Sequence, residues 1–182
     1  MRIFTNEAQY DLGPCAVALG TFDGVHIGHQ ALIRRAMELA MELGAASVVY
    51  TFDRHPLSML SPARAPRELL TLDEKLCKLE DLGVDGVLVK PFTPEFAAMD
   101  PTVYLEMLVS KMRAKAVVAG FNYTFGAMGR GDAALIRSEA VRLGYRAEIV
   151  DAVKDGGDTV SSTLIRSLQD RGEIARAARL MR

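Results

Sequence analysis

Residues 15–33 read CAVALGTFDGVHIGHQALI and contain two of the chain's three histidines. The first six residues form a short apolar run ending in Gly20, which is typical of a buried strand. From His29 to Gly44, apolar residues recur at three- and four-residue steps, which predicts a helix. We therefore expect a strand, a glycine-rich turn and a helix whose mouth carries His26 and His29.

The same alternation continues along the chain. Thr71 and Glu74 have the spacing of a capping box, and Asp100-Pro101 is a favoured helix start. Short apolar strands separated by helices predict an α/β fold with a parallel sheet flanked by helices. The segment 53–70 contains three prolines and is expected to be an irregular loop. The expected strands are 15–20, 47–52, 85–92, 115–120 and 145–150, and the expected helices are 29–44, 71–83, 100–113, 132–143, 162–170 and 173–181.

The bulk properties exclude several classes of protein. The 182 residues are 49% hydrophobic and 25% charged, which fits one globular domain. A net charge of −1 gives no general attraction to nucleic acid or to an anionic membrane. No secretory signal or membrane-spanning run is visible, and the two cysteines, Cys15 and Cys77, do not suggest a disulfide framework. We expect a cytoplasmic protein without nucleic-acid or membrane partners.

The histidine turn is a candidate anion site. A helix that opens near Gly28 presents free N–H groups and the positive end of its dipole, an arrangement that binds phosphates. His26 and His29 can donate hydrogen bonds to phosphate oxygens on the same side. Two alternatives stay open from the residues alone: a metal site completed by His55, or ordinary capping and packing.

A second candidate lies in VSSTLIRSL, residues 160–168. Ser161 suits a helix N-cap, with Val160 and Ile165 as a hydrophobic staple. Ser162, Thr163 and Arg166 then share one helical face, where they could bind another phosphate. The alternative is a well-capped surface helix with a solvated arginine.

The third candidate is GFNYTFGAMGRGD, residues 120–132. Its aromatic residues Phe121, Tyr123 and Phe125 could line a flat-ring pocket or pack against the sheet, and Asn122 could bind through its amide. The chain has no P-loop, GxGxxG fingerprint or GxSxG elbow. These absences favour transfer of a phosphoryl or nucleotidyl group by positioning and charge neutralisation.

The order FDGVHIGH, TFDRHP, GFNYTFGAMGRGD and SSTLIR resembles the adenylyltransferase module of bacterial bifunctional riboflavin kinase/FAD synthetases, which belong to the HxGH nucleotidyltransferase superfamily. The resemblance covers nearly the whole chain. It implies a Rossmann-like fold, one adenylyltransferase domain over 1–182, and an enzyme that transfers AMP from ATP to FMN, with Mg²⁺, to give FAD and pyrophosphate.

The resemblance also implies roles for residues that match the family's motifs. His26, His29, Asn122 and Arg166 would be catalytic. ATP would be bound by Gly20, Phe22, Asp23, Gly24, Gly28, Ser161, Ser162 and Thr163, and the flavin by His55, Pro56, Phe121, Tyr123 and Phe125. No Mg²⁺ ligand is assigned.

One departure from the family concerns the riboflavin kinase domain that follows this module in relatives. The chain ends at ARLMR, where that domain would begin. We therefore expect residues 1–182 not to phosphorylate riboflavin, and formation of FMN from riboflavin and ATP would contradict this expectation.

Three other functions compete with this one. The letters HIGH occur in class I aminoacyl-tRNA synthetases, but the lysine-rich stretch KMRAK (111–115) precedes an expected strand instead of forming a late loop. A pantetheine-phosphate adenylyltransferase or a glycerol-phosphate cytidylyltransferase would share the first motif. The non-enzymatic alternative is a module that binds a flavin or a nucleotide without turnover.

Overall fold

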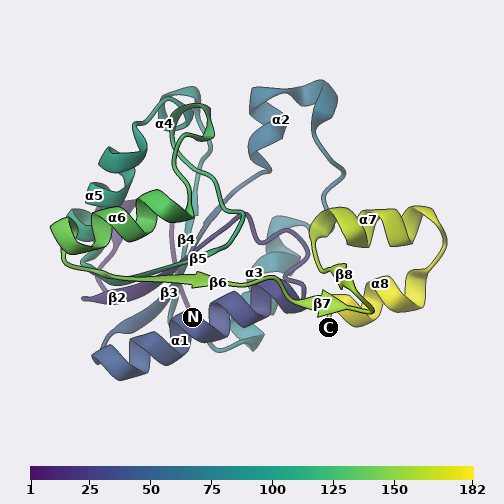
Figure 1. Cartoon of the computed structure of the whole chain (residues 1–182), viewed down its shortest axis with the longest axis horizontal. Coiled ribbons are helices and arrows are strands. Elements are labelled where there is room, and N and C mark those ends of the chain that lie inside the picture. Colours follow the sequence, from purple (N-terminus) through teal and green to yellow (C-terminus); the bar gives the residue numbers. More distant parts are fainter.

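Six parallel strands form the central sheet of the computed structural model, which describes residues 1–182 (Figure 1). Their spatial order is β1-β4-β3-β2-β5-β6, and every neighbouring pair is parallel. This confirms the predicted Rossmann-like α/β fold. The strands are β1 (Arg2–Phe4), β2 (Cys15–Leu19), β3 (Ala46–Phe52), β4 (Gly86–Lys90), β5 (Ala114–Gly120) and β6 (Arg146–Val150).

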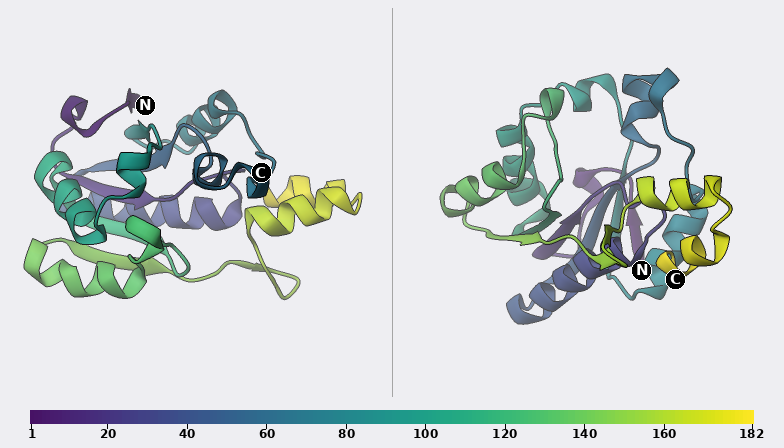
Figure 2. Two further views of the ribbon diagram at one scale, coloured as in Figure 1. Left: turned by 90° about the horizontal axis from the view of Figure 1, so that it is seen from above. Right: turned by 45° about the vertical axis from the view of Figure 1, so that its right-hand side comes forward.

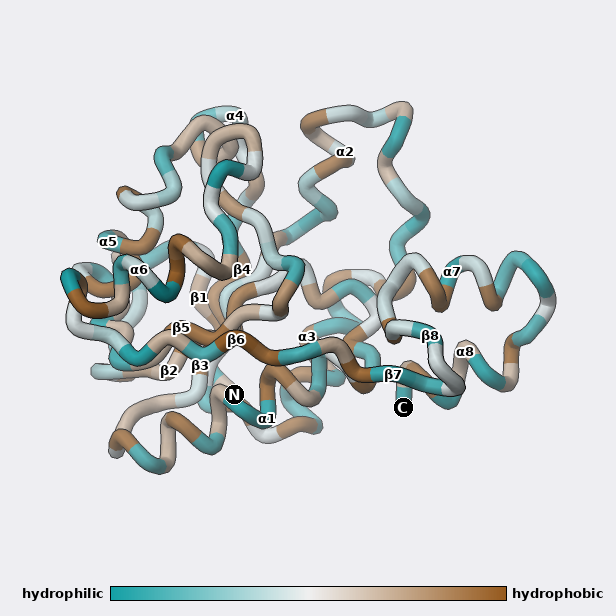
Figure 3. The backbone as a smooth tube through the Cα atoms, viewed as in Figure 1, coloured by the Kyte–Doolittle hydropathy of each residue, from teal (hydrophilic) through white to brown (hydrophobic).

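Helices cover both faces of the sheet. On one face, α1 (Ile27–Leu43) and α3 (Leu72–Asp81) pack against the strands, and α5 (Pro101–Met112) and α6 (Ala133–Leu143) pack on the other. Successive residues of β2 point to opposite faces: Val17 joins the cluster under α5 and α6, and Ala18 joins the cluster under α1. All five residues of β2 are buried, so this central strand is apolar on both sides. Figure 3 shows the hydropathy of each residue along the chain.

The strand order reverses direction between β2 and β5. The chain moves outward from β2 through β3 to β4 on one side, and β5 returns to pair with the other edge of β2. Such a switch point leaves a crevice beyond the carboxyl ends of the two strands, where open α/β sheets bind ligands. The loops that follow β2 and β5 carry the histidine motif and GFNYTF, so both motifs meet at this crevice.

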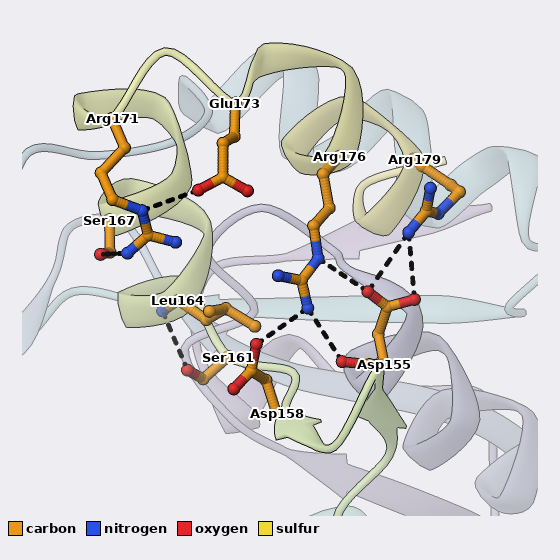
Figure 4. Close-up of polar contacts among 9 residues, drawn as sticks. All are labelled: Asp155, Asp158, Ser161, Leu164, Ser167, Arg171, Glu173, Arg176 and Arg179. Carbon is orange, nitrogen blue, oxygen red and sulfur yellow. Dashed lines mark hydrogen bonds and ion pairs between the residues drawn. The ribbon is translucent and has the colours of Figure 1, made fainter.

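The C-terminal helices α7 (Ser162–Asp170) and α8 (Ile174–Leu180) form a pair that extends beyond the sheet (Figure 2). They share a small apolar cluster with Val160. A hairpin of β7 (Lys154–Asp155) and β8 (Asp158–Thr159) leads into α7. Arg176 on α8 donates to the carboxylates of Asp155 and Asp158 at 2.9 Å, which ties the hairpin to the helix pair (Figure 4).

Most predicted elements are confirmed, including their caps. Thr71 and Glu74 form the predicted capping box, and Ser161 accepts a hydrogen bond from the N–H of Leu164 as the N-cap of α7. Gly44 ends α1 in the left-handed region, with φ +57°.

The prediction that 53–70 is entirely irregular is wrong. Pro56 occupies the first turn of α2 (Pro56–Leu60) with His55 as its N-cap, and a 3-10 turn, η2 (Pro62–Arg64), follows. The sheet also has one more strand than expected, the three-residue β1, which pairs with β4 and buries Phe4 in the core. The other elements not predicted are β7, β8, α4 (Pro94–Ala97), η1 (Glu7–Gln9) and η3 (Ala127–Gly129).

None of the helices combines the length and the apolar character that crossing a bilayer needs.

Candidate active site

A cavity of about 560 Å³ lies at the carboxyl edge of the sheet. Its wall is formed by the loops after β2, β3 and β5 and by the segment from β6 to the first turns of α7. All the predicted site residues line this cavity except Asp23 and Gly24, which lie behind its wall. His29 and Arg166, far apart in the sequence, therefore face one cavity.

The mouth of α1 presents its two histidines as a stacked pair. His26 is the N-cap, and its Nδ1 accepts a hydrogen bond of 3.2 Å from the N–H of His29. The two rings lie 3.6 Å apart at an interplanar angle of 16°. A Cβ at Gly28 would lie 3.2 Å from the His26 ring, so this glycine allows the imidazole to fold over the helix terminus.

The loop before α1 has an unusual backbone. Phe22 and Val25 have positive φ angles of 50° and 40°, a conformation disfavoured above all for a β-branched residue. Gly24, at φ +87°, packs against the Leu69 side chain. Strain of this kind concentrates at functional sites, where the surrounding structure maintains it.

Burial keeps the stacked imidazoles neutral in the ligand-free protein. It lowers the pKa of His26 from 6.5 to about 4, and burial, with the neighbouring His26 and Lys75, lowers the pKa of His29. The Nδ1 atom of His29 is buried and has no hydrogen-bond partner. An anion bound beside the two rings would favour their charged forms and raise both pKa values. No group of three metal-ligating side chains exists here or elsewhere in the chain.

These lowered pKa values make the stability of the protein depend on pH. Between pH 6.5 and 4 the unfolded chain binds protons at His26 that the folded chain does not, so stability falls as the pH falls. His26→Asn keeps an N-cap side chain but cannot titrate. We expect it to remove up to about 3 kcal/mol of the destabilisation between pH 7 and pH 4. Urea unfolding at a series of pH values measures this, and parallel curves for the two proteins would contradict it.

The mouth of α7 is bonded to the loop that carries the histidines. The Ser162 hydroxyl donates to the carbonyl oxygen of Asp23 at 2.8 Å, and the Arg166 guanidinium is ion-paired with the Asp23 carboxylate. Arg166 Nε also donates to the Arg67 carbonyl at 2.6 Å. Asp23, predicted to bind ATP, thus holds Arg166 in place from behind the cavity wall.

Part of the cavity wall is aromatic. Tyr123 and Phe125 stack with ring centroids 5.7 Å apart, and Phe121 is half exposed at the wall. Phe125 also belongs to the hydrophobic core. This ring therefore both lines the cavity and packs against the sheet, the two roles that the sequence allowed. Asn122 is exposed on the same loop. His55 and Pro56 line the cavity from α2.

Gly126 lets the aromatic loop approach α5 closely. Its φ is +71°, and a Cβ there would lie 2.7 to 2.8 Å from three atoms of Pro101. We expect Gly126→Ala to lower the free energy of unfolding by about 2–3 kcal/mol, through strain and overpacking. Gly144→Ala is the matched control, because Gly144 has φ +73° but open space around it, and its cost should stay near 1 kcal/mol. Equal losses in chemical denaturation would contradict the role of close packing.

Sequence patterns did not single out several residues of the site. Asp151 is the one carboxylate of the cavity wall, and it follows β6 in a segment without any motif. Lys75 looks like an ordinary helix-surface lysine in the sequence, yet it is buried beneath the histidine loop. The additional aromatic wall residues come from four separate segments: Phe52, Phe92, Phe96 and Tyr104.

The parallel sheet and the cavity at its switch point, with two helix N-termini and an aromatic wall, define the class as a Rossmann-like protein of the nucleotidyltransferase type. A model of the FAD synthetase family matches residues 8–164. The chain belongs to the FAD synthetase family.

Known relatives agree with this assignment. The chain is 37% identical to the bifunctional riboflavin kinase/FMN adenylyltransferase of Listeria monocytogenes over 91% of its length, and 32% identical to that of Escherichia coli over all of it. It spans only 52% and 58% of those two proteins. It covers 92% of a putative enzyme of the same name from Geobacillus thermodenitrificans, at 36% identity.

Solved structures show the same fold. A protein described as a macrolide-efflux protein from Streptococcus pneumoniae superimposes with a TM-score of 0.83 at 29% identity, over 99% of this chain and 60% of that one. A pantoate-beta-alanine ligase from Francisella tularensis gives a TM-score of 0.56 at 16% identity, over 97% of this chain and 79% of the ligase, and shows likeness of fold alone.

Proposed function

We propose that the chain is an FMN adenylyltransferase, which transfers AMP from ATP to FMN and releases pyrophosphate. The observation that carries this proposal is that one cavity wall combines imidazoles, hydroxyls and a guanidinium with several aromatic rings. The first set suits a triphosphate, and the second suits a flat, largely apolar ring system. One cavity can therefore hold both substrates with their phosphates adjacent.

The reaction needs no nucleophile from the protein. A phosphate oxygen of FMN forms a bond to the α-phosphorus of ATP, and the bond to the bridging oxygen of the β-phosphate breaks. The electron pair leaves with pyrophosphate. Neither cysteine lines the cavity, and burial raises the pKa of Cys15 to about 12. Catalysis then consists of positioning and charge stabilisation.

We assign the roles as follows. His26, His29 and Asn122 bind the reacting phosphates, and Arg166 binds the pyrophosphate. ATP is held by the hydroxyl-bearing residues Ser161, Ser162 and Thr163 at the start of α7 and by the loop residues Gly20, Phe22 and Gly28. Asp23 and Gly24, predicted to bind ATP, do not line the cavity and act indirectly, Asp23 through its ion pair with Arg166. His55, Pro56, Phe121, Tyr123 and Phe125 hold the flavin.

Mg²⁺ fits this site as an ion carried by the nucleotide. Mg²⁺ usually takes phosphate oxygens and water with one or two carboxylates, and the cavity wall offers one carboxylate, Asp151. Asp151 would be its ligand from the protein. The ion would offset phosphate charge and polarise the α-phosphorus. Two free cysteines fit a reducing cytoplasm, where we place the reaction.

The test is incubation of the purified chain with ATP, FMN and Mg²⁺, followed by chromatography for FAD and an assay for pyrophosphate. We expect equal amounts of the two products, and no product when phosphopantetheine replaces FMN. Turnover of phosphopantetheine would assign a different acceptor. Quenching of flavin fluorescence without pyrophosphate release would instead indicate a binding module.

A further inference from the structure

Lys75 is a buried cation that the cavity wall does not include. It lies in the first turns of α3 and is 8% exposed. Its Nζ donates to the carbonyl oxygens of Phe52 and Thr21, at 2.9 and 3.3 Å, and lies 3.4 Å from the hydroxyl of Thr51. Three acceptors around one nitrogen match the three donors of an ammonium group.

No carboxylate lies within ion-pair distance of this charge, although Asp23, Glu68 and Asp53 act on it from farther away. Lys75 has no ion-pair partner within 4 Å, and all three of its acceptors are neutral. The nearby Asp23 carboxylate is already bonded to Arg166 and to the N–H of Leu69. Asp53 accepts from the N–H of Phe92. Burial lowers the pKa of Lys75 despite these carboxylates, and a buried ammonium without a contact ion pair is unfavourable for folding, so its retention calls for another reason.

The position of the ammonium supplies that reason. Thr21 begins the loop that leads to His26, and Phe52 ends the strand that leads to His55. Lys75 therefore joins the backbones of the two loops that bring the histidines to the cavity. Its charge adds to the positive end of the α1 dipole at the place where the proposed function puts the triphosphate.

We propose that Lys75 is a positioning residue for the nucleotide: its ammonium holds the loops after β2 and β3 together and supplies a positive charge that a bound polyphosphate offsets. The proposal rests on the proposed function, because it takes ATP as the anion. Lys75 does not touch the substrate in this arrangement and acts through the two loops and through its field.

The test compares Lys75→Met, which removes the charge and the hydrogen bonds, with Lys75→Arg, which keeps a cation. Lys111→Met is the matched control, since Lys111 is exposed near the far end of α5. Calorimetry gives the Kd of ATP, and steady-state assays give KM and kcat. All proteins are compared at a temperature at which thermal melts show them folded. Lys75→Gln replaces Lys75→Met if the latter fails to fold.

We expect Lys75→Met to raise the Kd and KM for ATP about tenfold or more, with a smaller change in kcat, and Lys75→Arg to restore part of the affinity. Lys111→Met should bind ATP like the wild type. A change confined to the melting temperature, with ATP affinity within twofold of wild type, would overturn the proposal.

A second measurement reports the electric field of Lys75 without turnover. The chain has only three histidines, so NMR titration resolves each imidazole. His29 faces His26 and Lys75, and His55 faces Arg166, Asp23, Glu68 and Lys75. Lys75→Met should raise the pKa of His29 and of His55, and unchanged values would contradict the proposed field.

The two proposals fail separately. If the wild-type chain binds ATP but forms no FAD, the proposed function is wrong while the role of Lys75 is still judged by ATP affinity. If the wild type forms FAD and Lys75→Met binds ATP equally well, only the inference about Lys75 is wrong.

Discussion

Replacing His29 by alanine should slow FAD formation by about ten- to a thousandfold. His29 lies at the N-terminus of α1, is stacked on His26 and has a buried Nδ1 atom without a partner. Burial lowers its pKa, so the ring is neutral until the phosphates arrive. It then gains a hydrogen-bond partner just where negative charge develops. The rate of pyrophosphate release at saturating ATP and FMN measures the loss.

His29→Gln serves as the control for packing, because alanine leaves a void between the rings of Phe22 and His26. Glutamine fills more of this space and keeps one N–H donor. We expect a rate between those of the wild type and the alanine variant, with melting temperatures that confirm folding. An unchanged rate in a folded His29→Ala protein would remove His29 from the mechanism.

Arg166→Met should lower kcat/KM for ATP by about a hundredfold. Arg166 is the one cation of the cavity wall, and its side chain is only 15% exposed. Its bonds to Asp23 and to the Arg67 carbonyl fix the guanidinium before the substrate binds. A preorganised donor of this kind stabilises the leaving pyrophosphate without reorganisation. Arg166→Lys should not restore full activity, because an ammonium lacks the planar fork of donors.

The matched control for Arg166 is Arg171→Met, on the same helix pair. Arg171 is exposed at the end of α7 and donates to Ser167 and Glu173 (Figure 4), and it does not line the cavity. Its removal should leave kcat/KM within twofold of wild type. Loss of activity in both variants would point to a structural effect on α7 instead of a contact with pyrophosphate.

Local patterns in the sequence were sufficient for most of the fold. The helix from 27 to 43 is encoded by apolar spacing and by Gly44, and the capping box from Thr71 to Glu74 is a four-residue pattern. The parallel orientation of the strands could be predicted because a helix lies between each expected strand and the next. The edge strand β1 could not be predicted, because three residues with an exposed Ile3 carry no signal until β4 pairs with them.

The candidate site, like the fold, combines features that the sequence predicts with features that only tertiary contacts create. The sequence by itself determined which groups are present: two histidines at one helix mouth, and hydroxyls with an arginine at another. These are local signals, set by residues within one or two turns. Only the tertiary structure decided that both mouths face one cavity, that Asp23 holds Arg166, and that Lys75 is buried beneath the loops. Those facts depend on which strands become neighbours and on desolvation between segments distant in the chain, and no local pattern records either.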